Sequence, residues 1–382
     1  MIDPQSQKKL QTAISHRIAQ DRHLLDELRR DVRPLRDQVR QIQPRGTTAL
    51  SLVATDGGNN RVQFDPFLAQ LVRVVDSSNN EYYIDVVTPT TDTDELSRAQ
   101  FNGQGQPQTA LGEMMHYLGA RHLADLSYMV PAAGSQRQVS ARWVEVYREL
   151  IEWAVLLSII RNKEFGTDTL IVFDGLLRSK VFREDLFHQY LKGIVEGMRA
   201  HLGKKRKVYL VGIAKHSKVL SRYRLTLALE QVLVTDYPAY TEIPRELEEK
   251  AYVHADYARG DDIALPTARL NRFVGGKMFF VKFGSRPHDP IWPVDIFLPQ
   301  HKDAPAIFGH LLADALNGFP VPFYPLCLQR AHENAALIDF DYYLLQDHIL
   351  DSIRQLLGEE AIDLDAFRLQ DLDPAQERYG FE

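Results

Sequence analysis

The chain of 382 residues has a single cysteine, Cys327, and no long apolar run. One cysteine excludes an internal disulfide and is typical of a protein that folds in the reducing cytoplasm. The longest apolar run, Val155 to Ile160 with Ser158 inside it, is far too short to span a membrane. Residues 1–45 are highly charged, so no basic-then-apolar signal segment opens the chain. These absences predict a soluble cytoplasmic protein with no membrane partner.

Several catalytic signatures are also missing. The chain contains no G-x-x-x-x-G-K-[ST] loop, which argues against ATP hydrolysis, and neither G-x-S-x-G nor H-E-x-x-H. Zinc-type Cys/His spacing does not occur. The net charge of -6 excludes a strongly basic surface overall, so any DNA-binding surface would have to be a local basic patch.

The first 45 residues are predicted to be an N-terminal amphipathic helical region. Between residues 5 and 43 a narrow apolar stripe recurs at helical spacing: Leu10, Ile14, Ile18, Leu25, Leu28 and Val32. This stripe predicts one or two long helices, which Pro34 kinks or divides. Two interpretations remain open. The helix packs on its own domain, or it packs against a second subunit.

Residues 46–382 are predicted to form one α/β domain that begins with an antiparallel meander. Its strands are expected at 49–56, 67–75 and 82–87, with a turn over 56–60. Residues 89–108, rich in Thr, Gln, Gly and Asp, predict a surface loop insertion. Helices at 109–127, 140–162, 181–201, 217–233 and 303–316 then alternate with strands at 168–174, 207–214, 277–283 and 292–298. Residues 235–272 are expected to be irregular, and a last long helix starts near Pro325. This element order is that of a ribonuclease H-like core, a mixed sheet with flanking helices.

Acidic residues stand where that fold brings carboxylates together. Asp56 and Asp174 each follow an apolar run that predicts a buried strand. The helix 140–162 carries Glu145, Glu149 and Glu152 on one face. We interpret Glu145 as solvated. Glu152 leads into an almost wholly apolar stretch, where an unpaired carboxylate is costly and a metal ion would be a partner. We therefore favour Glu152 as a ligand, with Glu149 as the alternative.

Five ordered motifs resemble the NurA family of nucleases. An apolar strand leads into Thr55-Asp56-Gly57-Gly58, and a helix carries Arg148-Glu149-Leu150-Ile151-Glu152-Trp153. A second strand ends in Phe173-Asp174-Gly175-Leu176-Leu177, and Gly212-Ile213-Ala214-Lys215 follows. The most specific motif is Tyr324-Pro325-Leu326-Cys327-Leu328-Gln329-Arg330-Ala331-His332, which is present in full. The first and third motifs lack the serine that the family has after Asp-Gly.

The resemblance implies a two-metal DNA nuclease that works with the hexameric ATPase HerA as a homodimer. Asp56, Glu152, Asp174 and His332 would be the metal ligands. Three carboxylates suit Mg²⁺ or Mn²⁺, and an imidazole favours Mn²⁺. Two ions about 3.5–4 Å apart would activate a water and stabilise the leaving 3′ oxygen. Lys215 would hold a phosphate or the attacking water, and Tyr324 would hydrogen-bond a phosphate or stack on a base.

A basic cluster surrounds the strand 207–214 on an otherwise acidic chain. Lys204 to Lys207 precede this strand, and Lys215, Lys218, Arg222 and Arg224 follow it. Arg206, Lys207, Lys215 and Lys218 are the candidates for contacts with the DNA backbone. The alternative for such a run is a solvated charged surface.

These patterns predict a metal-dependent deoxyribonuclease that acts with a HerA-type ATPase in DNA end processing, recombination repair or phage defence. The alternative is a DNA-binding scaffold subunit that caps and regulates the ATPase with little cleavage. Four ligand candidates on one chain favour the nuclease, because a scaffold has no need of them.

Overall fold

The computed structural model describes residues 2–46, 50–64, 67–132, 142–252, 273–336 and 339–358. Its strands are β1 (Arg40–Gln41), β2 (Leu50–Phe64), β3 (Phe67–Asp76), β4 (Glu81–Val87), β5 (Asp168–Asp174), β6 (Val208–Ile213), β7 (Ala239–Glu242), β8 (Gly276–Lys282) and β9 (Ile291–Phe297). Predicted positions 49, 140–141 and 253–272 lie outside the described residues, as do residues 359–382.

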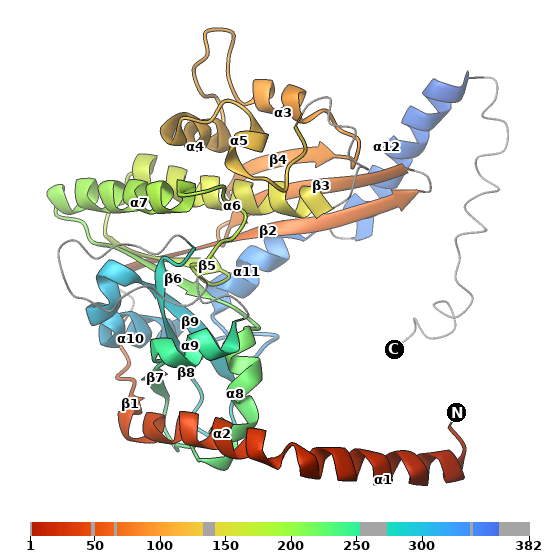
Figure 1. Ribbon diagram of the computed structural model, residues 1–382. Helices are drawn as coiled ribbons and strands as arrows, with labels where there is room; N and C mark the ends of the chain where they lie inside the picture. Colours follow the sequence, from red (N-terminus) through yellow and green to blue (C-terminus); the bar gives the residue numbers. More distant parts are fainter. Residues whose placement is uncertain are drawn as a thin grey trace.

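These strands form one mixed sheet in the order β1-β7-β8-β9-β6-β5-β2-β3-β4 (Figure 1). Strands β2, β3 and β4 are an antiparallel meander, and β5 and β6 run parallel to β2. The order β4-β3-β2-β5-β6 confirms the predicted mixed α/β sheet that begins with an antiparallel meander, and the ribonuclease H-like core stays a prediction. Strands β9, β8, β7 and β1 extend this half of the sheet with antiparallel pairs.

The helices are α1 (Pro4–Gln20), α2 (Arg22–Val32), the 3₁₀ helix η1 (Arg33–Gln38), α3 (Thr93–Ala99), α4 (Ala110–Leu118), α5 (Leu123–Leu126), α6 (Arg142–Asn162), α7 (Leu186–Gly203), α8 (Lys218–Leu229), α9 (Arg245–Ala251), the 3₁₀ helix η4 (Leu298–Asp303), α10 (Ala304–Ala315), α11 (Leu326–Ala335) and α12 (Asp339–Leu357). Among the described residues, no helix is long and apolar enough to cross a membrane.

Both faces of the sheet are covered, which the alternation of side chains along β5 makes clear. Ile171 and Phe173 pack into a core with α4, α6 and α7, whereas Leu170 and Val172 pack into a core with α10 and α11. Because both sets are apolar, β5 is a continuous apolar run, as expected for a buried parallel strand. Trp153 of α6 stacks on Phe173 at 4.6 Å between ring centroids, so α6 is fixed against the strand that carries Asp174.

The turn predicted over residues 56–60 is wrong, because β2 continues through it. The backbone stays paired with β3 from Thr55, opposite Asp76, to Phe64, opposite Phe67. The parallel pairing with β5 ends at Thr55, so Asp56 is the first residue beyond it. Glycine and asparagine tolerate turns but do not require them, and here the partner strand satisfies the backbone.

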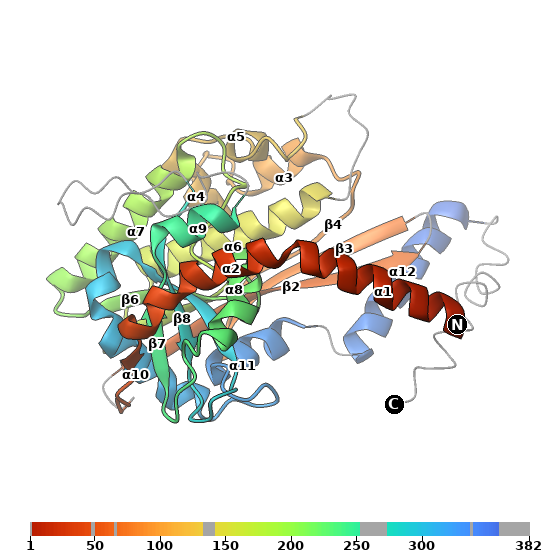
Figure 2. The ribbon, with the colours of Figure 1, turned by 60° about the horizontal axis from the view of Figure 1, so that its bottom comes forward.

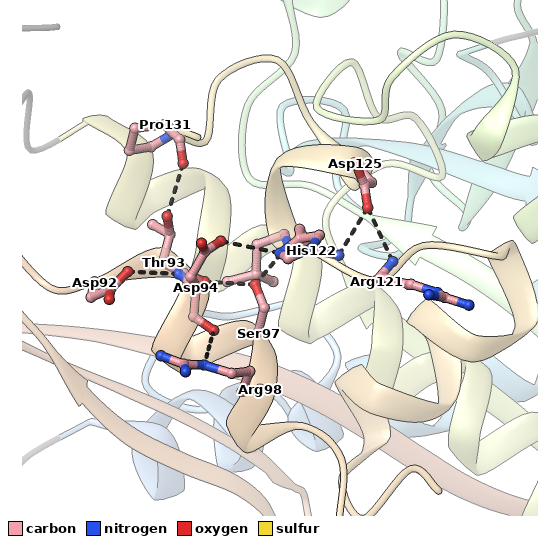
Figure 3. Close-up of polar contacts among 10 residues, drawn as sticks. Asp92, Thr93, Asp94, Ser97, Arg98, Arg121, His122, Asp125 and Pro131 are labelled. Atoms are coloured by element: carbon pink, nitrogen blue, oxygen red, sulfur yellow. Dashed lines mark hydrogen bonds and ion pairs between the residues drawn. The ribbon is translucent and has the colours of Figure 1, made fainter. Parts of the chain in front are cut away.

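The segment predicted as a loop insertion, 89–108, contains the helix α3. Asp92 accepts a hydrogen bond from the Asp94 amide at 2.9 Å and caps the helix, and Leu96 and Ser97 are buried. Figure 3 shows the contact of His122 with Asp94 and the caps that Asp125 makes to the amides of Arg121 and His122. Some of the polar residues in segment 89–108 therefore cap a helix and do not indicate a loop.

Two helices at the N-terminus differ in their packing. Helix α1 has no buried residue and extends away from the body, while α2 lies against α8 (Figures 1 and 2). Leu10, Ile14 and Ile18 are exposed, whereas Val32 is buried. The break between the helices falls at Asp21 rather than at Pro34, which lies in η1. No described residue buries the apolar stripe of α1. The interpretation that this stripe packs against a second subunit stays a prediction.

Two further predictions need correction. Residues 235–272, expected to be irregular, contain β7 and α9. The last long helix is two helices, since α11 ends at Ala335 and α12 starts at Asp339. Strand β7 is short and pairs with β8, so tertiary pairing rather than local propensity forms it.

Candidate metal centre

Three candidate ligands from distant parts of the chain meet at one end of the parallel strands. Asp56 directly follows the part of β2 that pairs with β5, Asp174 is the last residue of β5, and His332 lies on α11. Their ligand atoms all lie within 4.8 Å of one another. Helix α11 crosses β2 and β3, and Arg73 of β3 donates a hydrogen bond of 2.6 Å to the carbonyl of Asn334. The parallel strands β2 and β5 bring their two aspartates to the same edge of the sheet. Helix α11 packs against that edge and adds the imidazole of His332.

The imidazole of His332 lies against Asp56. Its Nδ1 and the Oδ2 of Asp56 are 2.7 Å apart. The hydrogen bond to Asp56 raises the pKa of His332, and burial opposes the shift. The His332 side chain is 59% exposed, whereas that of Asp56 is only 10% exposed.

Glu152 lies beside this group, although it is not one of the three residues within 4.8 Å. Its carboxylate occupies the space in front of Gly57, where a Cβ would overlap it. Burial raises the pKa of Glu152 to about 8; Arg148 opposes the shift, while Asp56, Glu149 and Asp174 add to it. Arg148 Nε is 3.5 Å from the carboxylate and its Nη1 donates to the carbonyl of Gly57.

The neighbouring Glu149 has a different environment. Its Oε1 accepts hydrogen bonds from Ser179 Oγ at 2.7 Å and from Trp153 Nε1 at 3.3 Å. Two neutral donors hold this carboxylate between α6 and the segment after β5. Glu145, in the first turn of α6, is exposed, as the solvated interpretation predicted. The geometry therefore favours Glu152 over Glu149 for contact with a cation.

The environment of Asp174 also favours a cation. Burial raises the pKa of Asp174 to about 6, and Asp56 adds to the shift, while Lys215 and Tyr324 oppose it. Tyr324 donates a hydrogen bond of 3.3 Å to its Oδ1. The Tyr324 side chain is buried and packs on Trp292 at 4.8 Å between ring centroids. The prediction that Tyr324 stacks on a base is therefore wrong, because neither face of the ring is accessible. Its hydroxyl orients Asp174 instead.

The basic candidates fall at two ends of β6. Lys215 and Lys218 follow the strand, on the side of Asp174, and both are exposed. Lys215 Nζ is 5.8 Å from the ring centroid of Tyr324. Arg206 and Lys207 precede the strand, and Lys207 pairs with Asp303 at 3.2 Å. The six residues of β6 span roughly 20 Å, so the structure does not bring these two pairs together.

Sequence reasoning missed two residues that shape the site. Gly57 was noted as part of a predicted turn and of the first motif but was given no role, yet its missing side chain leaves the space that Glu152 occupies. Trp292 on β9 packs on Tyr324, and its Nε1 donates to the carbonyl of Phe323 at 2.6 Å. No local signal marks Trp292, because its partner lies 32 positions later in the sequence.

Four solved structures of NurA nucleases are similar to the chain, and NurA is the family that the motifs resemble. The NurA nuclease from Sulfolobus solfataricus is 12% identical, with 94% of this chain and 99% of that chain covered and a TM-score of 0.40. NurA bound to dAMP and manganese is 10% identical, covering 91% and 98%, with a TM-score of 0.43. NurA with manganese is 12% identical, covering 90% and 98%, with a TM-score of 0.37. No protein-family model and no curated protein matches the chain.

Proposed function

We propose that this chain is a metal-dependent deoxyribonuclease that hydrolyses phosphodiester bonds. The observation that carries the proposal is the meeting of Asp56, Asp174 and His332 within 4.8 Å. Burial, with smaller contributions from the neighbouring carboxylates, raises the pKa values of Asp174 and Glu152, so ionising these groups requires a positive charge beyond what Arg148 and Lys215 supply. Clustering carboxylates in this way costs folding free energy, which a scaffold protein has no reason to bear. In a metal site the bound cation offsets that cost.

The donor set fits a hard divalent cation. Carboxylate oxygens from Asp56, Asp174 and Glu152 suit Mg²⁺ or Mn²⁺, and the His332 imidazole favours Mn²⁺. Neighbouring ligands of an octahedral ion lie about 3 Å apart, since each is about 2.1 Å from the metal. The 2.7 Å between His332 Nδ1 and Asp56 Oδ2 is close to that spacing, so only a small shift is needed. When bound, two such ions polarise the phosphate and lower the pKa of a water.

The remaining side chains position the substrate and the ligands. Lys215 is exposed beside Asp174 and is suited to hold a phosphate of the DNA backbone. Tyr324 holds Asp174 by its hydroxyl, and Arg148 holds Glu152. Hydrolysis adds water across the P–O3′ bond, so the products carry a 5′-phosphate and a 3′-hydroxyl.

Several parts of the function rest on the family resemblance alone. They are the homodimer, the HerA-type hexameric ATPase as partner, and a role in DNA end processing, repair or phage defence. The cytoplasmic location rests on the single cysteine. Comparing cleavage with and without a HerA-type ATPase tests the partnership directly.

The nuclease proposal is tested with labelled single-stranded DNA. The purified chain should cleave it with Mn²⁺ and not with EDTA. Asp174→Asn should abolish cleavage, because the amide keeps the shape and loses the charge that binds the metal. Glu145→Gln is the matched control, since it removes an exposed carboxylate from α6 and should leave activity unchanged. Metal-independent cleavage, or wild-type activity of a folded Asp174→Asn protein, would contradict the proposal. Binding of DNA without any cleavage would favour the scaffold alternative.

A further inference from the structure

The imidazole of the candidate metal centre lies in the last turn of a short helix. Helix α11 has ten residues and ends at Ala335, so His332 belongs to its last turn. The last carbonyl groups of a helix have no partner within it, and helix ends fray. The His332 side chain is also largely exposed, so packing on neighbouring residues does not fix the ring. The position of His332 therefore depends on what holds the last turn of α11.

Two hydrogen bonds anchor this turn to β3. Arg73 of β3 donates from Nη1 to the carbonyl of Asn334 at 2.6 Å. The side chain of Asn334 donates from Nδ2 to the carbonyl of Asp76, at the end of the same strand, at 3.2 Å. Glu81 of β4 pairs with Arg73 Nε at 2.8 Å, which orients the guanidinium group. A cation at the C-terminal end of a helix also interacts favourably with the helix dipole.

The anchored turn and the metal centre share one part of the sheet. Helix α11 lies over β2 and β3, and Asp56 of β2 is opposite Val75 of β3 in the register. Nδ1 of His332 and Oδ2 of Asp56 are 2.7 Å apart. His332 and Asp56 cannot keep this hydrogen bond while both atoms bind a cation. The backbone of α11 then has to hold the imidazole in place.

We propose that Arg73 is a positioning residue of the candidate metal centre. By its bond to the Asn334 carbonyl it holds the last turn of α11, so that His332 stays within reach of a cation bound by the two aspartates. This inference rests on the proposed nuclease function. Arg73 has two effects on a bound cation, and they have opposite signs. Its own positive charge weakens binding of the cation, whereas holding His332 strengthens it.

The first experiment measures Mn²⁺ binding directly, from the electron paramagnetic resonance signal of free Mn²⁺. Arg73→Met should weaken binding by about 10-fold, as for other residues that orient a metal ligand, although loss of the positive charge alone would tighten it. Arg73→Lys keeps the charge without the two-pronged geometry and should weaken binding by about 3-fold. Glu81→Gln should change binding by less than about 2-fold, because it leaves the bond to Asn334 intact. Arg161→Met is the matched control, since it breaks a partly exposed pair with Glu196 between α6 and α7.

A second measurement follows amide hydrogen exchange in EDTA, where metal binding plays no part. The amide of Ala336 donates to the His332 carbonyl at 3.0 Å. In Arg73→Met this amide should exchange about 10-fold faster, while the amides of β5 stay as protected as in the unsubstituted protein. Cleavage at saturating Mn²⁺ should stay within about 2-fold of the unsubstituted rate, so that the loss lies in the Mn²⁺ concentration needed.

Mn²⁺ affinity of Arg73→Met equal to or above that of the unsubstituted protein, or unchanged exchange at Ala336, would overturn the inference and leave the nuclease proposal intact. If Arg73→Met does not fold, Arg73→Lys decides in the same way. If the unsubstituted chain neither binds Mn²⁺ nor cleaves DNA, the proposed function itself fails. The two failures are therefore distinguishable.

Discussion

Replacing Glu152 by glutamine should stabilise the metal-free protein. Burial beside Asp56 and Asp174 raises the pKa of Glu152 from 4.5 to about 8. At pH 7 the unfolded carboxyl is ionised and the folded one is mostly protonated. With 1.36 kcal/mol per pKa unit and 2.5 units between 4.5 and 7, the native state is destabilised by about 3 kcal/mol. Glutamine removes this cost but also weakens the contact of this side chain with Arg148, so we expect a net gain of about 1–2 kcal/mol.

The sign of the pH dependence follows from the direction of the shift. A carboxyl with a raised folded pKa binds its proton more tightly in the native state. Its contribution to stability therefore falls as the pH rises from about 4.5 to about 8. The wild-type protein in EDTA should lose stability between pH 5.5 and pH 8.5, and Glu152→Gln should lose less. Mn²⁺ should reverse the difference, because the wild-type site binds it better.

The assay is thermal unfolding with EDTA or with Mn²⁺ at pH 5.5, 7 and 8.5. A gain of 1–2 kcal/mol corresponds to about 1–3 °C in Tm for a chain of 382 residues. Glu145→Gln should leave Tm unchanged, because that side chain is exposed. The reasoning is refuted if Glu152→Gln melts below the wild type in EDTA at pH 8.5 with the same pH slope.

Three further predictions concern the same end of the sheet. Gly57→Ala should destabilise the protein by about 1–3 kcal/mol and reduce Mn²⁺-dependent cleavage, because the added Cβ displaces Glu152. Unchanged Tm and activity would show that Glu152 does not pack tightly against Gly57. His332→Ala should weaken Mn²⁺ binding, and high Mn²⁺ should partly restore cleavage; metal titrations that match the wild type would remove His332 from the site. Replacing Lys215 and Lys218 by alanine should flatten the slope of log affinity against log salt by about 1.4 for single strands, and an unchanged slope would mean that the DNA lies elsewhere.

The strands and helices with strong local signals are predictable from the sequence. The run from Leu170 to Phe173 predicted a buried strand that ends in Asp174, and β5 ends there. The apolar stretch after Glu152 predicted the buried half of α6. Such segments form because every residue in them prefers the same burial, so tertiary contacts only reinforce the local pattern.

Segments with weak or contrary local signals were predicted wrongly. Residues 56–60 have turn composition, yet pairing with β3 keeps them extended. Strand β7 has four residues and depends on β8. Helix α3 lies in a polar stretch, where Asp92 caps it and Thr93 Oγ1 donates to the distant carbonyl of Pro131. In each case a partner distant in the sequence supplies the energy, and a local pattern does not contain that partner.

The sequence by itself determined the kinds of side chain available and the elements that carry Asp174 and Glu152. It could not separate Glu149 from Glu152, because both lie on one face of the same helix. Tertiary packing separates them, since Glu152 fills the space over Gly57 and Glu149 is held by Ser179. The contact of Asp56 with His332 spans 276 positions of the chain. Which carboxylates share a site is a matter of spatial distance, and charge interactions depend on that distance and on burial. Both the distances between these charged groups and their burial are set only when the sheet has folded and α11 packs across its edge.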